Sequence, residues 1–448
     1  MTNDPSSPPS PQRGSISGNY NIIVQASGNG ITIDFSQPHL TLHARHRLAP
    51  EPKKYLDLLN PNNRAIPMVG RESELHALEA WLDGPGISAR CLTGGAGSGK
   101  TRLALELCAA ADQRKWFAGF IDHKELDRFG GQQNLSAWGW PKPTLIVVDY
   151  AAAKARILRE WLVELVQHQG KDLMPLRLLL LERHADLTLG WWPELTTPRG
   201  WAEEGLRDLF NPSEPIPLGM ITGIEHRRQI LASAMAAAAR LPGAHKPLRP
   251  PAAGEDPAFD RRLANPELEF APLHLMMAGI LGVEHGIGTL LTLGPMEMAE
   301  DLANFELGRF DKLALDRKLD SEFLRHLAAG ITLIGGLSRD DLDQVIAEEG
   351  QAIGCGDERR RVERTLLDAL PSEQPNQLAP ILPDLIGEAA IVNVLEALPP
   401  KRQADTIVRW HNRAPSGAMA GIIRTIQDYA DKNDHVALKW FDAIIAGT

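Results

Sequence analysis

The stretch TGGAGSGKT, residues 93–101, holds four glycines, a lysine and a threonine at fixed offsets. Residues 90–92 are typical of the end of a buried strand, and the apolar spacing of residues 102–107 predicts a helix. In that context the spacing predicts a P-loop, whose backbone N–H groups surround phosphate oxygens, whereas a flexible turn would not constrain its flanks. Lys100 is expected to reach the β- and γ-phosphates, and the Thr101 hydroxyl to bind Mg²⁺. The residues of this expected site are Gly94, Gly95, Ala96, Gly97, Ser98, Gly99, Lys100, Thr101 and Arg102.

Two later apolar segments end in further candidate residues. Residues 143–150, PTLIVVDY, predict a parallel strand that is buried on both faces and ends at Asp149. A lone aspartate after a strand is usually a turn former, but about fifty residues after a P-loop it is expected to hold Mg²⁺ through water. Residues 176–186, LRLLLLERHAD, predict another buried strand, which ends at Arg183.

Composition excludes several classes of protein. The 448 residues include 57 acidic and 47 basic ones, a net charge of −10 without a basic stripe, so nucleic acid is an unlikely partner. The three cysteines show neither metal-ligand spacing nor an even disulfide framework, which indicates buried thiols in a reducing cytoplasm. The N-terminus lacks the apolar region of a signal peptide, and no stretch approaches the roughly 18 to 20 apolar residues of a membrane span. We therefore expect a soluble, cytoplasmic chain with no membrane partner.

An internal repeat follows a Pro/Ser-rich N-terminus. SGNYNIIVQA, residues 17–26, and SGNGITIDFS, residues 27–36, each predict a turn and a short strand. The two units could stack as rungs or pair as a hairpin. Their Val, Ile, Asn and Gln content is also typical of cross-β segments, with Gln25 and Asn29 as ladder-forming candidates. Homotypic self-assembly is one hypothesis, and a small β-element docked on this chain or on a partner is the other.

The rest of the pattern predicts a multidomain α/β plus α chain. Residues 68–82, MVGRESELHALEAWL, predict an amphipathic helix, and residues 214–221 predict the last strand of a parallel-sheet core. Afterwards the apolar periodicity is helical, with a surface loop expected at residues 241–257. The expected divisions are a disordered segment (1–15), a β-strand repeat (16–36), a linker (37–60), a P-loop NTPase α/β core (61–221), a helical lid (222–315), a winged-helix-like module with Ser338 as a helix N-cap (316–398), and about three C-terminal helices (399–448).

These features, in their order, resemble bacterial STAND NTPases, the class that contains the NACHT and NB-ARC proteins. LIVVDYA, LRLLLLER with WW nearby, FAPLHLMMAG and LAPILPDLIGEA look like successive landmarks, and the resemblance covers roughly residues 60–400. It implies that Val69, Gly70 and Arg71 line the adenine pocket. It also implies that Arg183 senses the γ-phosphate, where the alternative is a solvated strand end. Pro272 would contact the base from the lid, although a proline that merely starts a helix predicts the same sequence.

One departure from the family concerns hydrolysis. Many relatives carry a second acid after the aspartate to orient the attacking water, whereas Tyr150 and three alanines follow Asp149 here. Glu182 is the only acid that could substitute, and strand alternation could point it away. We therefore expect slow turnover.

The resemblance implies an ATP/ADP-binding switch with Mg²⁺ that forms homo-oligomers on activation, in bacterial signalling or anti-phage defence. The N-terminal repeat, which loosely resembles amyloid-signalling motifs, would be its output, and an effector or sensor protein a possible partner. A C-terminal sensor either lies beyond this sequence or is replaced by a partner. One alternative is an AAA-like ATPase that remodels a client. Another is an ATP-regulated transcription regulator, which should carry a basic C-terminal recognition helix, and none is evident.

Overall fold

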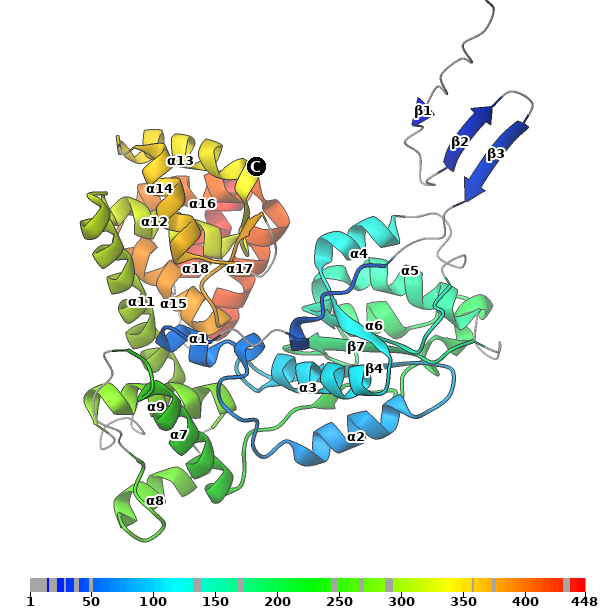
Figure 1. Cartoon of the computed structure of the whole chain (residues 1–448), viewed down its shortest axis with the longest axis horizontal. Coiled ribbons are helices and arrows are strands. Elements are labelled where there is room, and N and C mark those ends of the chain that lie inside the picture. Colours follow the sequence, from blue (N-terminus) through cyan, green and yellow to red (C-terminus); the bar gives the residue numbers. More distant parts are fainter. Residues whose placement is uncertain are drawn as a thin grey trace, which may run out of the picture. The chain divides into compact units, whose positions relative to one another are not determined.

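The computed structural model describes residues 14–15, 22–27, 30–35, 40–47, 51–131, 139–167, 173–242, 249–265, 270–286, 293–356, 358–372, 376–429 and 436–447 (Figure 1). The chain divides into two compact units. The first comprises residues 1–47, 73–94 and 103–218, and the second comprises residues 48–72, 95–102 and 219–448. Most of the P-loop therefore groups with the helical half of the chain, although it was expected within a continuous core of residues 61–221.

The first unit is built on a five-stranded parallel sheet, which confirms the predicted fold class. Its strands, in spatial order, are β5 (Phe117–Ile121), β6 (Thr144–Asp149), β7 (Leu176–Glu182), β4 (Ile87–Thr93) and β8 (Ile216–Pro217). Pairing of Thr93 with Glu182, and of Asp149 with Leu181, aligns the ends of β4, β6 and β7 at one edge. Strand β8 has only two residues, and Pro217 has no N–H to extend the ladder.

Helices cover both faces of this sheet. The core on one face joins the sheet to α4 (His123–Gly130), α5 (Ala155–Val166) and α6 (Trp191–Thr196). Trp192 is a packing residue of this core: it is 3% exposed and meets Phe210 with ring centroids 4.9 Å apart. On the other side lie α2 (Glu72–Leu82) and the part of α3 (Lys100–Gln113) that belongs to this unit (Figure 1). The predicted helices before and after the P-loop are thus confirmed.

The N-terminal repeat forms an antiparallel pair of strands. β2 (Ile22–Ser27) pairs with β3 (Gly30–Phe35), with Val24 opposite Ile33 and Gln25 opposite Thr32. The structure therefore agrees with the hairpin hypothesis and not with stacked rungs. A third short strand, β1 (Gly14–Ser15), pairs with β2 at the end of the segment that was expected to be disordered. Residues 1–13 and the ladder candidate Asn29 lie outside the described residues.

The second unit is helical, as predicted after residue 221. Its first part contains α1 (Tyr55–Leu59), α7 (Ile224–Ala238), α8 (Pro257–Ala264), α9 (Pro272–His285) and α11 (Pro295–Arg317). Next come α12 (Ser321–Leu333), α13 (Arg339–Ile353), α14 (Arg359–Ala369) and α15 (Asp384–Glu396), with an antiparallel pair of strands, β9 (Leu337–Ser338) and β10 (Gln377–Leu378). Ser338 is the N-cap of α13, as expected, and accepts a hydrogen bond from Asp340 N at 3.3 Å.

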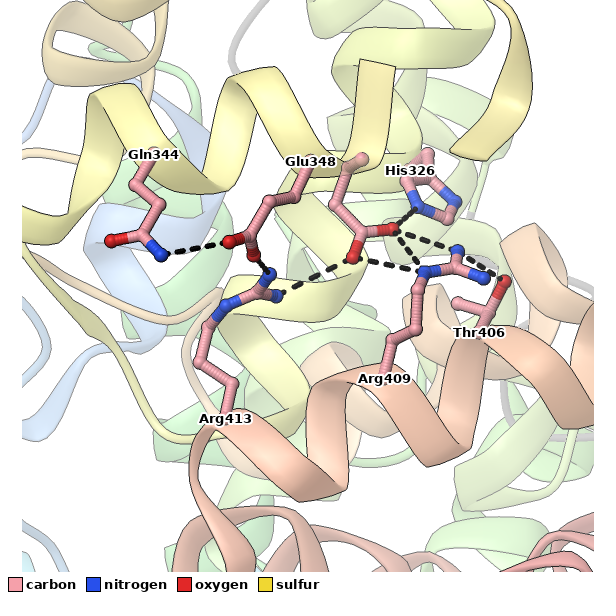
Figure 2. A network of polar contacts seen from close by, with 7 residues as sticks. His326, Gln344, Glu348, Thr406, Arg409 and Arg413 are labelled. Atoms are coloured by element: carbon pink, nitrogen blue, oxygen red, sulfur yellow. Dashed lines mark hydrogen bonds and ion pairs between the residues drawn. The ribbon is translucent and has the colours of Figure 1, made fainter. Parts of the chain in front are cut away.

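The predicted C-terminal helices are α16 (Pro400–Arg413), α17 (Pro415–Asp428) and α18 (Val436–Gly447). A buried carboxylate joins α16 to α13 and α12. Glu349 has no exposed surface and accepts hydrogen bonds from His326 Nε2 at 2.8 Å and Arg409 Nη2 at 2.8 Å, with Arg413 Nη1 at 3.4 Å. Figure 2 shows how the arginines of α16 reach toward α13. In the part of the chain that the structure describes, no helix is long and apolar enough to cross a bilayer.

Candidate functional site: a P-loop and its supporting residues

Within the first unit, Asp149 stands at the end of β6. Its Oδ1 accepts a hydrogen bond from Tyr150 N at 3.1 Å, and its backbone carbonyl lies 2.9 Å from His123 Nε2. Tyr150 adopts a left-handed conformation with φ 54°, which is uncommon for a residue other than glycine and is frequent at functional sites. The turn after Asp149 is thus held in a strained shape at the edge where the strands end.

Glu182 at the end of β7 lies beside that turn. Its Oε2 accepts a hydrogen bond from Ala152 N at 2.9 Å, and its Oε1 accepts one from Arg183 N at 2.7 Å. The carboxylate therefore does not point away from the turn, as strand alternation had suggested it could. Both of its oxygens serve as acceptors for backbone N–H groups, which gives Glu182 a structural role at this edge.

Arg183 is 6% exposed, so it is not a solvated strand end. Its carbonyl accepts a hydrogen bond from Gly94 N at 3.2 Å, and the same N–H lies 3.3 Å from the carbonyl of Glu182. The first glycine of the motif is thereby fixed to the end of β7. Whether the guanidinium meets a γ-phosphate stays a prediction.

Residues 95–102 belong to the second unit. Gly97 and Gly99 have φ values of 73° and 96°, which only glycine adopts at little cost. The ammonium of Lys100 donates to Gly95 O at 3.2 Å and lies 3.5 Å from Ser98 Oγ, so it folds over the loop. A loop with two left-handed glycines, a lysine over it and a helix start after it fits a phosphate chemically. Thr101 is the second residue of that helix, α3.

The segment before α2 supports the loop from the same unit. Arg71 is 4% exposed and donates to Ser98 O at 3.2 Å and to the carbonyl of Gly219. Arg102, the third residue of α3, donates in turn to Ile66 O at 2.8 Å. Val69 is 7% exposed within the apolar core, and Gly70 has a φ of 72° beside His226. The bonds of the Arg71 guanidinium thus hold the P-loop backbone, while an adenine pocket at these residues stays a prediction.

Pro272 is the first residue of α9 and also a neighbour of the P-loop. A Cβ on Gly99 would lie 3.7 Å from Pro272 Cγ. The next residue, Leu273, donates its backbone N–H to Gly97 O at 3.2 Å. Pro272 therefore starts a helix and also lies beside the P-loop. No sequence signal distinguishes Leu273 from any other core leucine in FAPLHLMMAG.

Asp384, the first residue of α15, was not anticipated either. Burial raises the pKa of its carboxyl group, whereas Arg424 and Lys100 lower it and Asp428 raises it further. A carboxyl group thus lies within electrostatic reach of the P-loop lysine. The only signal in the sequence was an acid that follows Leu-Pro at a helix start.

Within the described ranges, the histidines, cysteines and acids form no cluster of three or more that could hold a metal ion. A magnesium ion bound through Thr101, phosphate oxygens and water does not require such a cluster. Cys91 and Cys108 are buried as expected, and burial raises the pKa of both thiols, whereas Cys355 is only half-buried.

No family model and no curated protein matches the chain. Similar solved structures include the Aeropyrum pernix ORC1 protein in complex with DNA, with 16% identity, a TM-score of 0.33, and coverage of 77% of this chain and 98% of that one. A katanin structure, which concerns the self-assembly of that protein, has 16% identity and a TM-score of 0.29. The match covers 53% of this chain and 80% of that one. The Drosophila ORC bound to DNA has 13% identity, a TM-score of 0.29, and coverage of 77% and 97%.

The expectation that nucleic acid is an unlikely partner was wrong as an exclusion. Two of these similar structures are of proteins bound to DNA. The net charge of −10 is a sum over the whole chain and describes no single face. Phosphate contacts need only a local group of basic residues. The acidic balance therefore does not rule out a nucleic acid partner.

The class of the chain follows from its own topology. A parallel sheet aligns three strand ends at one edge, and strand β4 runs directly into a glycine-rich loop and then into helix α3. The long helical part that follows contributes contacts to that loop. The chain therefore has the fold of a P-loop α/β core, a parallel sheet with a glycine-rich loop between strand and helix, joined to large helical parts.

Proposed function

We propose that the chain is a nucleotide-dependent switch of the STAND kind, which binds ATP or ADP with Mg²⁺ and self-associates when it is activated. The observation that carries this proposal is the direct bonding of P-loop carbonyls by two distant segments, through Arg71 and through the start of α9. A phosphate that reorganises the loop must act on both contacts. Occupancy of the loop can thus change the packing of the helical unit.

In this proposal the backbone N–H groups of the P-loop and Lys100 hold the phosphates. Thr101 and Asp149 hold Mg²⁺, and the bound ion neutralises phosphate charge. Val69, Gly70 and Pro272 border the base, and Arg183 responds to the γ-phosphate. The helices α12–α14 with the strands β9 and β10 support a winged-helix-like relay. The role in bacterial signalling or anti-phage defence rests on the family resemblance alone.

Hydrolysis is expected to be slow, on the order of one turnover per minute or less, against roughly 1 to 100 per second in kinases. The reason is that no acid follows Asp149 directly and both oxygens of Glu182 accept backbone hydrogen bonds. The test is purification without added nucleotide, analysis of the bound nucleotide, and a steady-state assay with and without duplex DNA. Bound ADP and a slow rate support the switch.

Many turnovers per second without any trigger would contradict the switch and favour the remodelling ATPase. The matched control is Asp149→Asn, which should lower even the slow rate while ADP remains bound. A strong increase of the rate with DNA would add a nucleic acid partner to the proposal.

The N-terminal strands are proposed as the output of the switch. Two or three short strands are marginal alone, and clustering by an ATP-bound core raises their effective concentration toward the millimolar range. Replacing Val24 and Ile31 together with lysine places like charges in every layer of an assembly. We expect the double variant to lose large assemblies in sedimentation with ATP while it keeps its ATP affinity.

The docked-element hypothesis expects a different result from the same variant, namely a lower melting temperature of the monomer without a selective effect on assembly. Normal assemblies at an unchanged melting temperature would contradict both hypotheses. Replacement of two exposed residues outside these strands, Lys142 and Arg156, by glutamate controls for the general effect of altered charge on sedimentation.

A further inference from the structure

The start of α9 packs against the P-loop more closely than any residue other than glycine would allow. A Cβ on Gly97 would lie 3.1 Å from Leu273 Cδ2 and only 2.6 Å from Leu273 Cβ, and the second distance is shorter than real Cβ atoms show. Leu273 is 7% exposed, and its N–H donates to Gly97 O at 3.2 Å. Position 97 thus requires glycine for two reasons: the φ of Gly97 is 73°, and Leu273 leaves no room for a side chain.

The two supporting contacts fall on consecutive peptide groups of the loop. Leu273 N–H holds the carbonyl of Gly97, and the Arg71 guanidinium holds the carbonyl of Ser98. In a planar trans peptide, the carbonyl and the following N–H point in opposite directions. Fixing these two carbonyls therefore fixes the directions of the N–H groups of Ser98, which donates to Gly95 O at 3.3 Å in this structure, and of Gly99. The N–H groups of a P-loop are its phosphate ligands.

We infer that Leu273 is a positioning residue that sets the phosphate-binding conformation of the P-loop. Its side chain lies over Gly97 while its N–H holds the Gly97 carbonyl, so the first turn of α9 acts as a clamp on the loop. The affinity for phosphate then depends on where α9 lies, even before any part of the nucleotide touches the helix. This inference rests on the proposed nucleotide-binding function.

The test compares Leu273→Ala with Leu281→Ala by calorimetry with ADP. Both variants remove the same atoms from the same helix, and Leu281 is fully buried about 12 Å further along the helix axis. We expect Leu273→Ala to weaken ADP binding about tenfold, at a temperature where both variants are folded. Leu281→Ala should change it less than twofold. Leu273→Val removes less of the side chain, so its ADP affinity should lie between those of wild type and Leu273→Ala. If Leu273→Ala does not fold, Leu273→Val takes its place in the comparison.

Hydrogen exchange of the apo protein supplies a readout that needs no nucleotide. The amides of residues 97–100 should exchange faster in Leu273→Ala than in Leu281→Ala, because only the first change loosens the clamp. Equal ADP affinity and equal exchange in the two variants would overturn the inference while leaving the proposed function intact. Tighter ADP binding by Leu273→Ala would also overturn it, since the contact would then block the loop. A wild-type protein that binds no ADP would overturn both.

Discussion

Replacing Lys100 with alanine is expected to abolish nucleotide binding or to weaken it by about 2 to 5 kcal/mol, the usual cost of removing one partner of a charged hydrogen-bonded pair. In the structure the ammonium lies over the loop, bonded to Gly95 O at 3.2 Å, where no other lysine or arginine is bonded to that carbonyl among the described residues. Calorimetry with ADP and with ATP measures the loss.

The matched control for this variant is Lys142→Ala, which removes the same charge from an exposed position ahead of β6. It should leave the affinity unchanged. Because Lys100 is only half-buried, the melting temperature without nucleotide should hardly move in either variant. An ADP affinity equal to that of wild type in Lys100→Ala would remove this lysine from the site.

The parts of the site that could be predicted are those encoded locally. The strand before the P-loop, the loop glycines and the helix after it lie within about thirty consecutive residues, and their pattern determines which conformations are open to them. The same holds for β6, whose apolar run is buried on both faces. Gly97 and Gly99 have the positive φ values that the motif requires.

What could not be predicted are contacts between distant segments. Leu273 touches Gly97 across more than 170 residues, and local periodicity does not say which leucine of a buried helix meets which loop. Arg177 is similar. Its place near the start of β7 does not indicate any partner, yet it is 1% exposed and donates to the carbonyls of Trp81 and Gly86 at 2.8 and 2.7 Å. Only the tertiary structure supplies such partners.

The P-loop groups with the helical unit for the same reason, namely contacts between segments that are distant in sequence. In the sequence the loop lies between a strand of the sheet and the helix that follows it, so a continuous core was expected. Its carbonyls, however, are bonded by Arg71 and Leu273, and Arg102 is bonded to Ile66. These bonds come from two segments that are separated in sequence by the whole sheet. A pattern of strands does not reveal which distant segments are hydrogen-bonded to a loop.

Replacing Glu349 with alanine is expected to destabilise the helical unit by about 3 to 5 kcal/mol, the typical cost of removing one partner from a buried ion pair. The carboxylate has no exposed surface and accepts hydrogen bonds from His326 and Arg409, with Arg413 nearby (Figure 2). Without it, Arg409 faces a cavity at α13 without this counter-charge, while Arg413 keeps its ion pair with Glu348. The melting curve, followed by the far-ultraviolet circular dichroism of the helices, measures the change.

Glu348 provides a matched control one residue away on the same helix. It also binds Arg413, at 2.5 Å, and accepts a hydrogen bond from Gln344 at 2.7 Å, but its side chain is 47% exposed. Solvent screens such a pair, so Glu348→Ala should cost no more than about 1 kcal/mol. Equal destabilisation by the two variants would mean that burial of Glu349 does not determine its contribution.

The pH dependence separates the charge of Glu349 from its packing. Burial alone would raise the pKa of this carboxyl group, but the hydrogen bonds from His326 and Arg409 outweigh burial and lower it from 4.5 to about 2. Between these values the folded protein holds fewer protons than the unfolded chain, so stability falls as the pH falls. The contribution, about 3 kcal/mol by this linkage, is fully present above pH 4.5 and is lost as the pH approaches 2. The difference in melting temperature between wild type and Glu349→Gln should therefore shrink from pH 5 toward pH 3, whereas a difference that stays constant would show that shape, and not charge, holds α16 to α13.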